Sequence, residues 1–417
     1  MSFLGAVENT PYTSISAKLR SIYLLGPAFV AGVAYLDPGN VATNLTASSK
    51  YGYLLLWVII AANLSAWLVQ YLSAKFGIAT GKSIPELLGE KITNRKFRVA
   101  YWAQAQLVAI ATDVAEIIGG AIALNILFNI PMLVGGIATG SFSIAHLSLR
   151  ERGKHRLFEV TILFLIAATA IGFTAGLFVA PANAHSMLQG LAPKFAGKES
   201  VLLAVSIFGA TIMPHAIYAH SALCRDRVMH QRGITTKTRA LKATKWDVSL
   251  AMLLAGLVNI GIFLVGAVNL YGKNVENSIV GAHAAITASL GVGLGTMFAI
   301  GLLASGIASS SVGTYASGVI TEGLLKLKLS FIQQRLIAII PALIIIYIAK
   351  DPTMALVFSQ VVLSLGIPFA LIPLIYLTSN GKIMGELKNK VRTKLIGYTV
   401  VTLLTALNLS MIYLLIF

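Results

Sequence analysis

Cysteine and charged residues are both scarce in this 417-residue sequence. The one cysteine, Cys224, excludes an intramolecular disulfide and a cysteine-rich metal cluster, and we interpret it as a small apolar side chain. Only 11% of the residues are charged, whereas a typical soluble domain has roughly 25%. Because 57% of the residues are hydrophobic and the mean hydropathy is +0.81, the composition predicts an integral membrane protein.

Other missing features narrow the function classes. No His-Glu-x-x-His string occurs, and no two histidines stand four residues apart, which argues against an intramembrane metalloprotease. An aspartyl protease would need two aspartates that share a proton, and this chemistry does not explain the broken helices described below. The sequence predicts no sizeable output domain between its apolar segments, which disfavours a metal sensor or receptor. We therefore do not expect an enzyme. The first 20 or so residues lack the apolar core of a cleavable signal peptide.

Eleven apolar segments are each long enough to cross about 30 Å of hydrocarbon. They lie at 21–47, 52–76, 99–128, 130–149, 157–181, 200–223, 247–271, 284–323, 333–349, 353–378 and 395–417. With the N-terminus in the cytoplasm and the C-terminus outside, all but five Lys and Arg fall on the cytoplasmic side; the exceptions are Lys50, Lys194, Lys198, Lys273 and Lys350. This asymmetry is typical of a multi-pass protein of the cell membrane.

The net charge of +17 does not indicate nucleic-acid binding, because the basic runs at 150–156 and 224–245 lie between apolar segments and act as topology signals. The short connections favour a bacterial inner membrane. The long segment at 284–323 is rich in Gly, Ser and Ala, which predicts close helix packing. Its length predicts a tilted helix or one that extends into the cytoplasm.

Two apolar segments carry helix-breaking residues near their middle. In "AYLDPGNVAT" (34–43), Pro38 removes a backbone donor and Gly39 permits unusual dihedrals, so the helix is expected to open at Asp37. In the sixth segment, Met213-Pro214-His215 predicts a second break. Backbone freed at membrane depth must face protein or a water-filled cavity. The two breaks therefore indicate a binding site.

The breaks stand at equivalent places five segments apart, so the second copy enters the membrane from the opposite side. This predicts two inverted five-helix repeats with binding at the midplane, as in many secondary transporters. We expect one transmembrane domain over 1–417, with repeats at about 18–181 and 199–378 and an eleventh helix at about 394–417.

The breaks would present a mixed set of donor atoms. Asp37 offers a carboxylate, Asn40 an amide oxygen, Met213 a thioether, and the freed backbone offers carbonyls at or near Ala34 and Ala210. Oxygen donors alone suit Mg²⁺ or Ca²⁺. A thioether is soft, so the mixture favours Mn²⁺, Fe²⁺ and their neighbours.

"DPGN" (37–40) and "MPH" (213–215) closely resemble motifs of the Nramp family of proton-coupled divalent-metal transporters, of the bacterial manganese-transporter type. The similarity extends to 111–128, 313–325 and 359–377. It implies an all-α LeuT-like fold with eleven transmembrane helices, of which helices 1 and 6 are broken. It also implies metal coordination by Asp37, Asn40, Met213 and the carbonyls of Ala34 and Ala210.

Ionisable residues within apolar segments could carry protons. Asp113 and Glu116 stand one helical turn apart on one face, and intramembrane acids are functional by default. The resemblance assigns the proton route to Asp37 and Asp113, supported by His215, Glu116, Arg227 and Arg335. Arg227 and Arg335 could equally anchor the inner membrane edge. His220, five residues after His215, is a further proton-route candidate or a helix-to-helix hydrogen-bond partner.

Three positions depart from the family pattern. Gln106 stands where a glutamate is common, so we expect altered proton coupling. Gly366 stands where many members have a glutamine that joins the metal shell, and we expect a gap there that a water fills. Gln334 precedes Arg335 where a second basic residue is usual. These departures affect coupling and selectivity, because the primary ligands are intact.

The favoured function is import of Mn²⁺ or Fe²⁺ with protons by alternating access, with Co²⁺, Cd²⁺ and Zn²⁺ as further candidate cargoes. Pro38, Gly39 and Pro214 are expected to form the hinges. We expect a monomer in the bilayer, with no prosthetic group and no nucleic acid. A Mg²⁺ carrier would be expected to lack Met213. A carrier with uncoupled proton flux remains an alternative, as does an amino-acid/Na⁺ symporter, whose substrate carboxylate Asp37 would repel.

Overall fold

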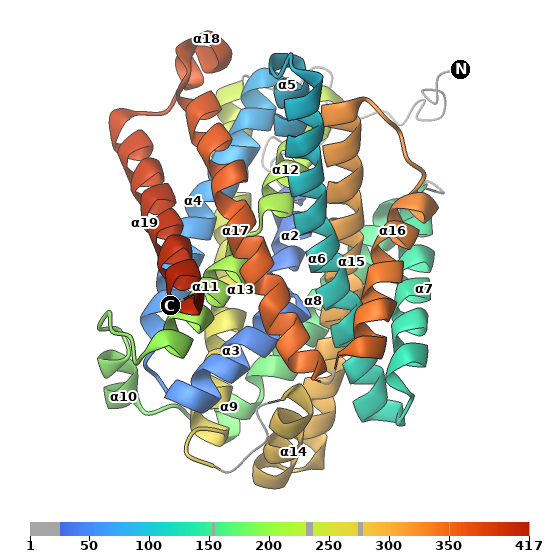
Figure 1. Ribbon diagram of the computed structural model, residues 1–417, viewed down its shortest axis with the longest axis vertical. Helices are drawn as coiled ribbons and strands as arrows, with labels where there is room; N and C mark the ends of the chain where they lie inside the picture. The colour runs from blue at the N-terminus through green and yellow to red at the C-terminus, as the bar shows by residue number, and fades with distance from the viewer. Residues whose placement is uncertain (1–25, 152–154, 231–236, 274–277, 350, 417) are drawn as a thin grey trace, which may run out of the picture.

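The protein is an all-helical bundle whose long helices run along its longest axis (Figure 1). The computed structural model describes residues 26–151, 155–230, 237–273, 278–349 and 351–416. In chain order its elements are α2 (Pro27–Val33), η1 (Ala34–Leu36), α3 (Pro38–Tyr51), α4 (Leu56–Thr80), α5 (Ile84–Lys91), α6 (Arg95–Phe128), α7 (Met132–Glu151), α8 (His155–Thr174), α9 (Gly176–Val179), α10 (Ala184–Gln189), α11 (Lys198–Thr211), α12 (Pro214–His230), α13 (Lys237–Asn269), α14 (Ile279–Leu290), α15 (Val292–Leu325), α16 (Phe331–Ile348), α17 (Pro352–Ser379), α18 (Gly381–Met384), η2 (Gly385–Leu387) and α19 (Val391–Ile416).

Each of the eleven predicted segments coincides with one helix or with consecutive helices among the described residues. Eight helices are long and apolar enough to cross a membrane, and shorter apolar helices lie at 27–36, 132–146, 279–290 and 332–348. Residues 21–25 of the first predicted segment and parts of both basic runs lie outside the described residues. The chain is therefore a multi-pass membrane protein.

The prediction of one long helix over 284–323 is wrong. The chain forms two helices, α14 and α15, which meet at Gly291. Gly291 has a φ of +95°, which L-residues rarely adopt. Part of the extra length is thus a separate short helix, at the end of the bundle opposite α5 and α18 (Figure 1).

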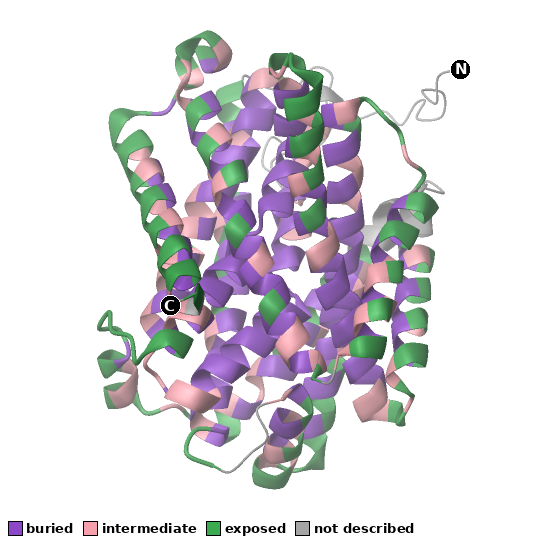
Figure 2. Cartoon of the chain, viewed as in Figure 1, coloured by how far each residue is buried: buried purple, intermediate pink, exposed green. Residues whose placement is uncertain are grey.

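The small residues of α15 bring its backbone against α6, as predicted. A Cβ on Gly306 would lie 2.9 Å from the carbonyl oxygen of Glu116. Such close approach allows dispersion contacts and polar contacts between helix backbones in a membrane. The buried residues occupy the middle of the bundle around α3, α6 and α15, whereas α19 and α16 carry many exposed residues at its edge (Figure 2).

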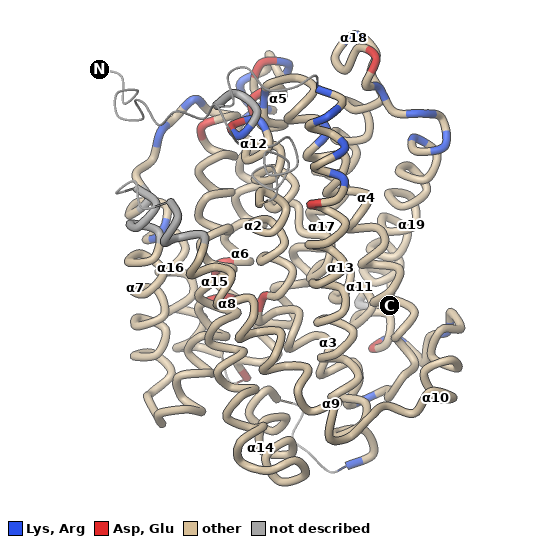
Figure 3. The backbone as a smooth tube through the Cα atoms, turned by 180° about the vertical axis from the view of Figure 1, so that it is seen from behind, with Lys and Arg blue, Asp and Glu red and all other residues tan. Residues whose placement is uncertain are grey.

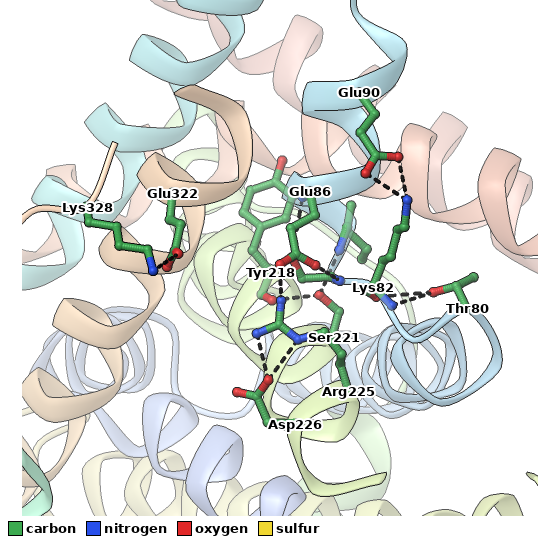
Figure 4. A network of polar contacts seen from close by, with 12 residues as sticks. Thr80, Lys82, Glu86, Glu90, Tyr218, Ser221, Arg225, Asp226, Glu322 and Lys328 are labelled. Atoms are coloured by element: carbon green, nitrogen blue, oxygen red, sulfur yellow. Dashed lines mark hydrogen bonds and ion pairs between the residues drawn. The ribbon is translucent and has the colours of Figure 1, made fainter. Parts of the chain in front are cut away.

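Lys and Arg gather at the end of the bundle that carries α5 and α18, which we call the basic end (Figure 3). A polar network fastens α5 to α12 there (Figure 4). Ser221 accepts the backbone N–H of Ile84 at 3.1 Å, and Arg225 pairs with Glu86. Since Glu86 also completes the capping box of α5 with Ser83, this short helix is held at its first turn.

Candidate metal centre

The first helix break lies at Asp37, as predicted. The 3₁₀ turn η1 ends at Leu36, Asp37 has extended dihedrals (φ −75°, ψ 160°), and α3 begins at Pro38. The Asp37 carboxylate accepts the backbone N–H groups of Gly39 at 3.1 Å and Asn40 at 2.9 Å. Proline is tolerated as the first helical residue because its missing N–H would have had no intrahelical partner. Asp37 thus caps α3 from a fully buried position.

The second break lies between α11 and α12. The helix α11 ends at Thr211, Ile212 leaves helical geometry (φ −107°, ψ 82°), and α12 begins at Pro214. Met213 lies between Ile212 and the first residue of α12, and it is completely buried. A thioether therefore lies at an interrupted helix in the protein interior, as the sequence predicted.

The side chain of Asn40 joins the two breaks. Its Nδ2 lies 2.8 Å from Oδ1 of Asp37, 3.1 Å from the carbonyl oxygen of Tyr35 and 2.8 Å from the carbonyl oxygen of Ala210. An amide NH₂ has only two hydrogens, so these three oxygens have more acceptor capacity than Asn40 can satisfy. Oxygens that converge in this way from a carboxylate and two carbonyls form a cage with the chemistry of a cation site.

The predicted backbone ligands are not equally placed. The carbonyl of Ala210 lies in the cage. On the side of the first break, the carbonyl in the cage belongs to Tyr35, which also accepts a hydrogen bond from Asn259 at 3.1 Å. Ala34 is fully buried one residue earlier, at the start of η1.

A glutamine of α17, missed by the sequence interpretation, lies against the first break. A Cβ on Gly39 would lie 1.8 Å from Nε2 of Gln360 and 2.8 Å from Oδ2 of Asp37. Gln360 is fully buried, and its Oε1 has no hydrogen-bond partner among the described residues. This oxygen is a further candidate donor. In the sequence, the indication of this role was an isolated amide side chain within an apolar segment.

The expectation of a gap at Gly366 is wrong. A Cβ there would lie 2.5 Å from Cγ2 of Val108 and 3.5 Å from Cγ of Pro214. The position is closely packed because α17 approaches α6 there, and glycine permits this approach. Gly366 therefore leaves no room for a water, and the side chain of α17 that lies beside Asp37 is Gln360.

Asp113 and Arg335 form a buried ion pair. Nη1 of Arg335 lies 2.8 Å from Oδ1 of Asp113, and the two side chains are 0% and 3% exposed. Arg335 also donates to Ser143 at 3.0 Å. Asp113 and Glu116 share a face, as predicted, because a Cβ on Gly313 would lie 2.8 Å from Oδ1 of Asp113 and 3.3 Å from Oε2 of Glu116. An acid pair beside one arginine can hold and pass a proton.

The two histidines of α12 point to different neighbours. Nδ1 of His215 lies 3.2 Å from the hydroxyl of Thr112, next to Asp113 on α6. Nδ1 of His220 lies 2.7 Å from Oε1 of Gln70 on α4, and Gln70 donates to the Tyr35 hydroxyl. This divergence follows from their spacing, since five residues rotate a helix by about 140° beyond one turn.

Arg227 lies beside the first turn of α2. A Cβ on Gly26 would lie 2.7 Å from its Nη1. The Asp247 carboxylate accepts the N–H groups of Gly26 and Ala28 at 3.1 Å. Arg335, from another helix, is the arginine that pairs with Asp113.

The amide of Gln106 is held by hydroxyl groups of α15. Gln106 donates to Ser317, and Thr321 donates to the side-chain oxygen of Gln106 at 3.5 Å. An amide in this place can accept and donate hydrogen bonds, but it does not titrate as the glutamate expected there would.

No three His, Cys, Asp or Glu side chains converge on a common point in the portion that the structure describes. A cation held at the breaks would therefore be coordinated by one carboxylate together with amide, carbonyl and thioether donors. Such a site has low charge and mixed hardness, which suits transient binding of a borderline divalent ion better than permanent binding.

Comparisons with known proteins assign nearly the whole chain to one family. Residues 28–414 match the family described as natural resistance-associated macrophage protein-like, Nramp. The divalent metal cation transporter MntH of Mycobacterium tuberculosis is 52% identical over 413 residues, which cover 99% of this chain and 96% of the relative. The protein of the same name from Bacillus subtilis is 45% identical over 411 residues, covering 96% and 95%.

Comparison with solved structures gives the same family and the fold. A mutant of the Eremococcus coleocola manganese transporter superposes with a TM-score of 0.85 at 30% identity, covering 97% of this chain and 90% of the other. MhsT in complex with L-phenylalanine superposes with a TM-score of 0.62 at 15% identity over 93% of this chain. At that identity the second likeness concerns the fold alone, which is the predicted LeuT-like fold.

Proposed function

This chain belongs to the Nramp family, and we propose that it imports divalent transition-metal ions, Mn²⁺ and Fe²⁺ foremost, across a cell membrane together with protons. Relatives that cover nearly the whole chain carry the name divalent metal cation transporter. The proposed ligands are Asp37, Asn40, Met213 and the carbonyl of Ala210. The carbonyls of Ala34 and Tyr35 and the side chain of Gln360 are further candidates.

The observation that carries the proposal is the contact between the two breaks. Three oxygens, two from the first break and one from the second, surround the amide nitrogen of Asn40 at 2.8–3.1 Å. Rotation of that amide would bring Oδ1 of Asn40, which has no hydrogen-bond partner among the described residues, toward the same point. A divalent cation at that point would be coordinated by these oxygens together.

Proton coupling is proposed to run from Asp37 through the acid pair on α6. Thr112 and His215 connect the second break to the neighbourhood of Asp113, and Arg335 stabilises the charged form of that acid. His220 and Arg227 are secondary candidates, because their contacts lead to Gln70 and to the start of α2. Gln106 leaves the route with one titratable group fewer than the family pattern.

The proposed mechanism is alternating access of a monomer whose N-terminus is cytoplasmic. Asp37 binds the ion and gives up any proton it holds, the outer half-helices α3 and α11 close, and α2 then moves away to release the ion inward. Pro38, Gly39 and Pro214 serve as hinges, since these positions need freed dihedrals. The two breaks would belong to inverted repeats at about 18–181 and 199–378, followed by an eleventh helix.

Uptake of ⁵⁴Mn²⁺ into proteoliposomes tests the proposal. With an acidic exterior, a pH dye in the lumen and excess Mg²⁺ or Ca²⁺ outside, we expect saturable Mn²⁺ entry that resists competition and acidifies the lumen. Entry without acidification would remove proton coupling and point to Gln106. Absence of entry, or full competition by Mg²⁺, would contradict a transition-metal cargo. Labelled amino acids in the same vesicles test the symporter alternative.

Met213→Ala should change selectivity more than it changes transport. We expect Mn²⁺ uptake to persist in part, while competition by Ca²⁺ and Mg²⁺ rises about tenfold, because the soft donor disfavours hard ions. The measurement is the ratio of inhibition constants for Mg²⁺ and Mn²⁺. Met411→Ala, which removes a buried methionine near the other end of the chain, controls for loss of a packed thioether. An unchanged ratio in Met213→Ala would refute the role of the sulfur.

A further inference from the structure

A group of four basic residues lies where α19 begins, at the basic end of the bundle. Lys388, Lys390, Arg392 and Lys394 fall within seven residues, and all four are exposed. None of them forms an ion pair within the described ranges. We call these four residues the basic strip.

Two other lysines at the same end are locally compensated. Lys82 pairs with Glu90 at 2.7 Å and Lys328 with Glu322 at 3.3 Å (Figure 4). Around the basic strip the only acid between residues 381 and 394 is Glu386. The basic strip therefore concentrates positive charge that no ion pair of the described residues neutralises. The α5 region, in contrast, contains both acidic and basic side chains.

The loop that carries the basic strip is pinned to the bundle. Asn389 is buried between two of the lysines. Its backbone N–H donates to the carbonyl of Thr378 at 2.9 Å and its side chain to the hydroxyl of Thr378 at 2.8 Å. Lys75 of α4 donates to its Oδ1 at 3.0 Å. These bonds hold Lys388 and Lys390 on either side of a fixed point, so their charges are presented by an ordered loop.

Exposed apolar side chains begin inside the basic strip. Val391 is 82% exposed, Leu395 67% and Ile396 55%, and all three lie on the first turns of α19 at the edge of the bundle (Figures 1 and 2). In a membrane protein such side chains face hydrocarbon. The cations beside them therefore lie at the level of the lipid headgroups, where long basic side chains extend toward phosphate.

We propose that the basic strip is a binding surface for the headgroups of anionic phospholipids. Clusters of four to eight Lys and Arg directly beside a transmembrane helix attract anionic lipid by about 1 kcal/mol per charge. The apolar flank supplies the site for the acyl chains of the same lipid molecule. An acidic soluble protein would match the charges and leave that flank unused. This inference does not depend on the transported ion.

Native mass spectrometry of the full chain in detergent tests the surface. The chain is titrated with phosphatidylglycerol and with phosphatidylcholine of the same acyl chains, and the ratio of the two apparent Kd values is measured. We expect a preference for phosphatidylglycerol in the wild type. In the variant Lys388→Gln, Lys390→Gln, Arg392→Gln, Lys394→Gln it should fall at least tenfold, since each charge near the headgroups contributes about fivefold.

A matched variant separates the basic strip from overall charge. Lys82→Gln, Lys91→Gln, Lys326→Gln and Lys328→Gln remove four charges from the same end and should keep the preference. An equal loss in both variants would overturn the proposal, because net charge alone would then explain it. Displacement of the lipid by millimolar inorganic phosphate would also overturn it in favour of a free-anion site. If the quadruple variant fails to fold, the two pairs 388/390 and 392/394 are tested separately, each with an expected loss of at least fivefold.

Discussion

Asp37→Ala is expected to reduce Mn²⁺ uptake to the level of empty vesicles. The change removes the carboxylate that lies at the breaks among the described residues, and with it one of the three acceptors of the Asn40 amide. It also removes the cap that accepts the N–H groups of Gly39 and Asn40, at a cost of about 0.5–2 kcal/mol of stability. The measurement is initial ⁵⁴Mn²⁺ uptake by equal amounts of reconstituted protein, together with the thermal unfolding midpoint.

Asp37→Asn separates the two roles of this side chain. An asparagine caps a helix about as well as an aspartate, so this variant should unfold near the wild-type temperature. It lacks the charge that balances a divalent cation, so uptake at low Mn²⁺ should still be lost. Normal uptake in either variant would contradict the assignment of the metal centre. Loss of uptake in Asp37→Ala alone would show that the side chain matters only as a cap.

Arg335→Ala is expected to destabilise the protein by about 3–5 kcal/mol, because it leaves the buried carboxylate of Asp113 without its counter-charge. The lost bonds to Ser143 and Thr314 add to the effect. A clear fall in the thermal unfolding midpoint in detergent is the measurement. Lys328→Met, which breaks the exposed pair with Glu322, should cost less than about 1 kcal/mol.

The double variant Asp113→Leu, Arg335→Met tests whether the pair serves stability or transport. Removing both members of the ion pair leaves neither partner as an uncompensated charge, so most of the lost stability should return. Proton flux should remain uncoupled from metal flux, since the acid proposed to carry the proton is gone. A double variant that regains coupling would remove Asp113 from the proton route. A single variant Arg335→Ala as stable as the wild type would show that Asp113 is neutral or hydrated in the fold.

The positions of both helix breaks could be predicted from local sequence. Proline removes a backbone donor and disfavours helix at the residue before it, and Pro38 and Pro214 each begin a new helix after a break. Pro341, Pro368 and Pro373 lie inside continuous helices, so proline alone did not mark the breaks. The polar residues Asp37, Asn40 and His215 beside Pro38 and Pro214 distinguished these two positions. The span count and the concentration of cations at one end likewise follow from the chain, because hydropathy and charge are properties of segments. The motifs at the two breaks led to the correct family, and the residues there supply the donor types proposed for the metal centre.

Which side chains meet at the breaks was decided only by the tertiary structure. Gln360 and Gly366 stand six residues apart on α17, which places them about 120° apart around the helix. The rotation of α17 about its axis determines which of them faces Asp37, and that rotation is a result of packing against α6 and α11. The same holds for the choice of the Tyr35 carbonyl, for the pairing of Arg335 with Asp113 across 222 positions, and for the loop that holds the basic strip. Local sequence indicates where a helix can open, whereas contacts between distant segments determine what its opening faces.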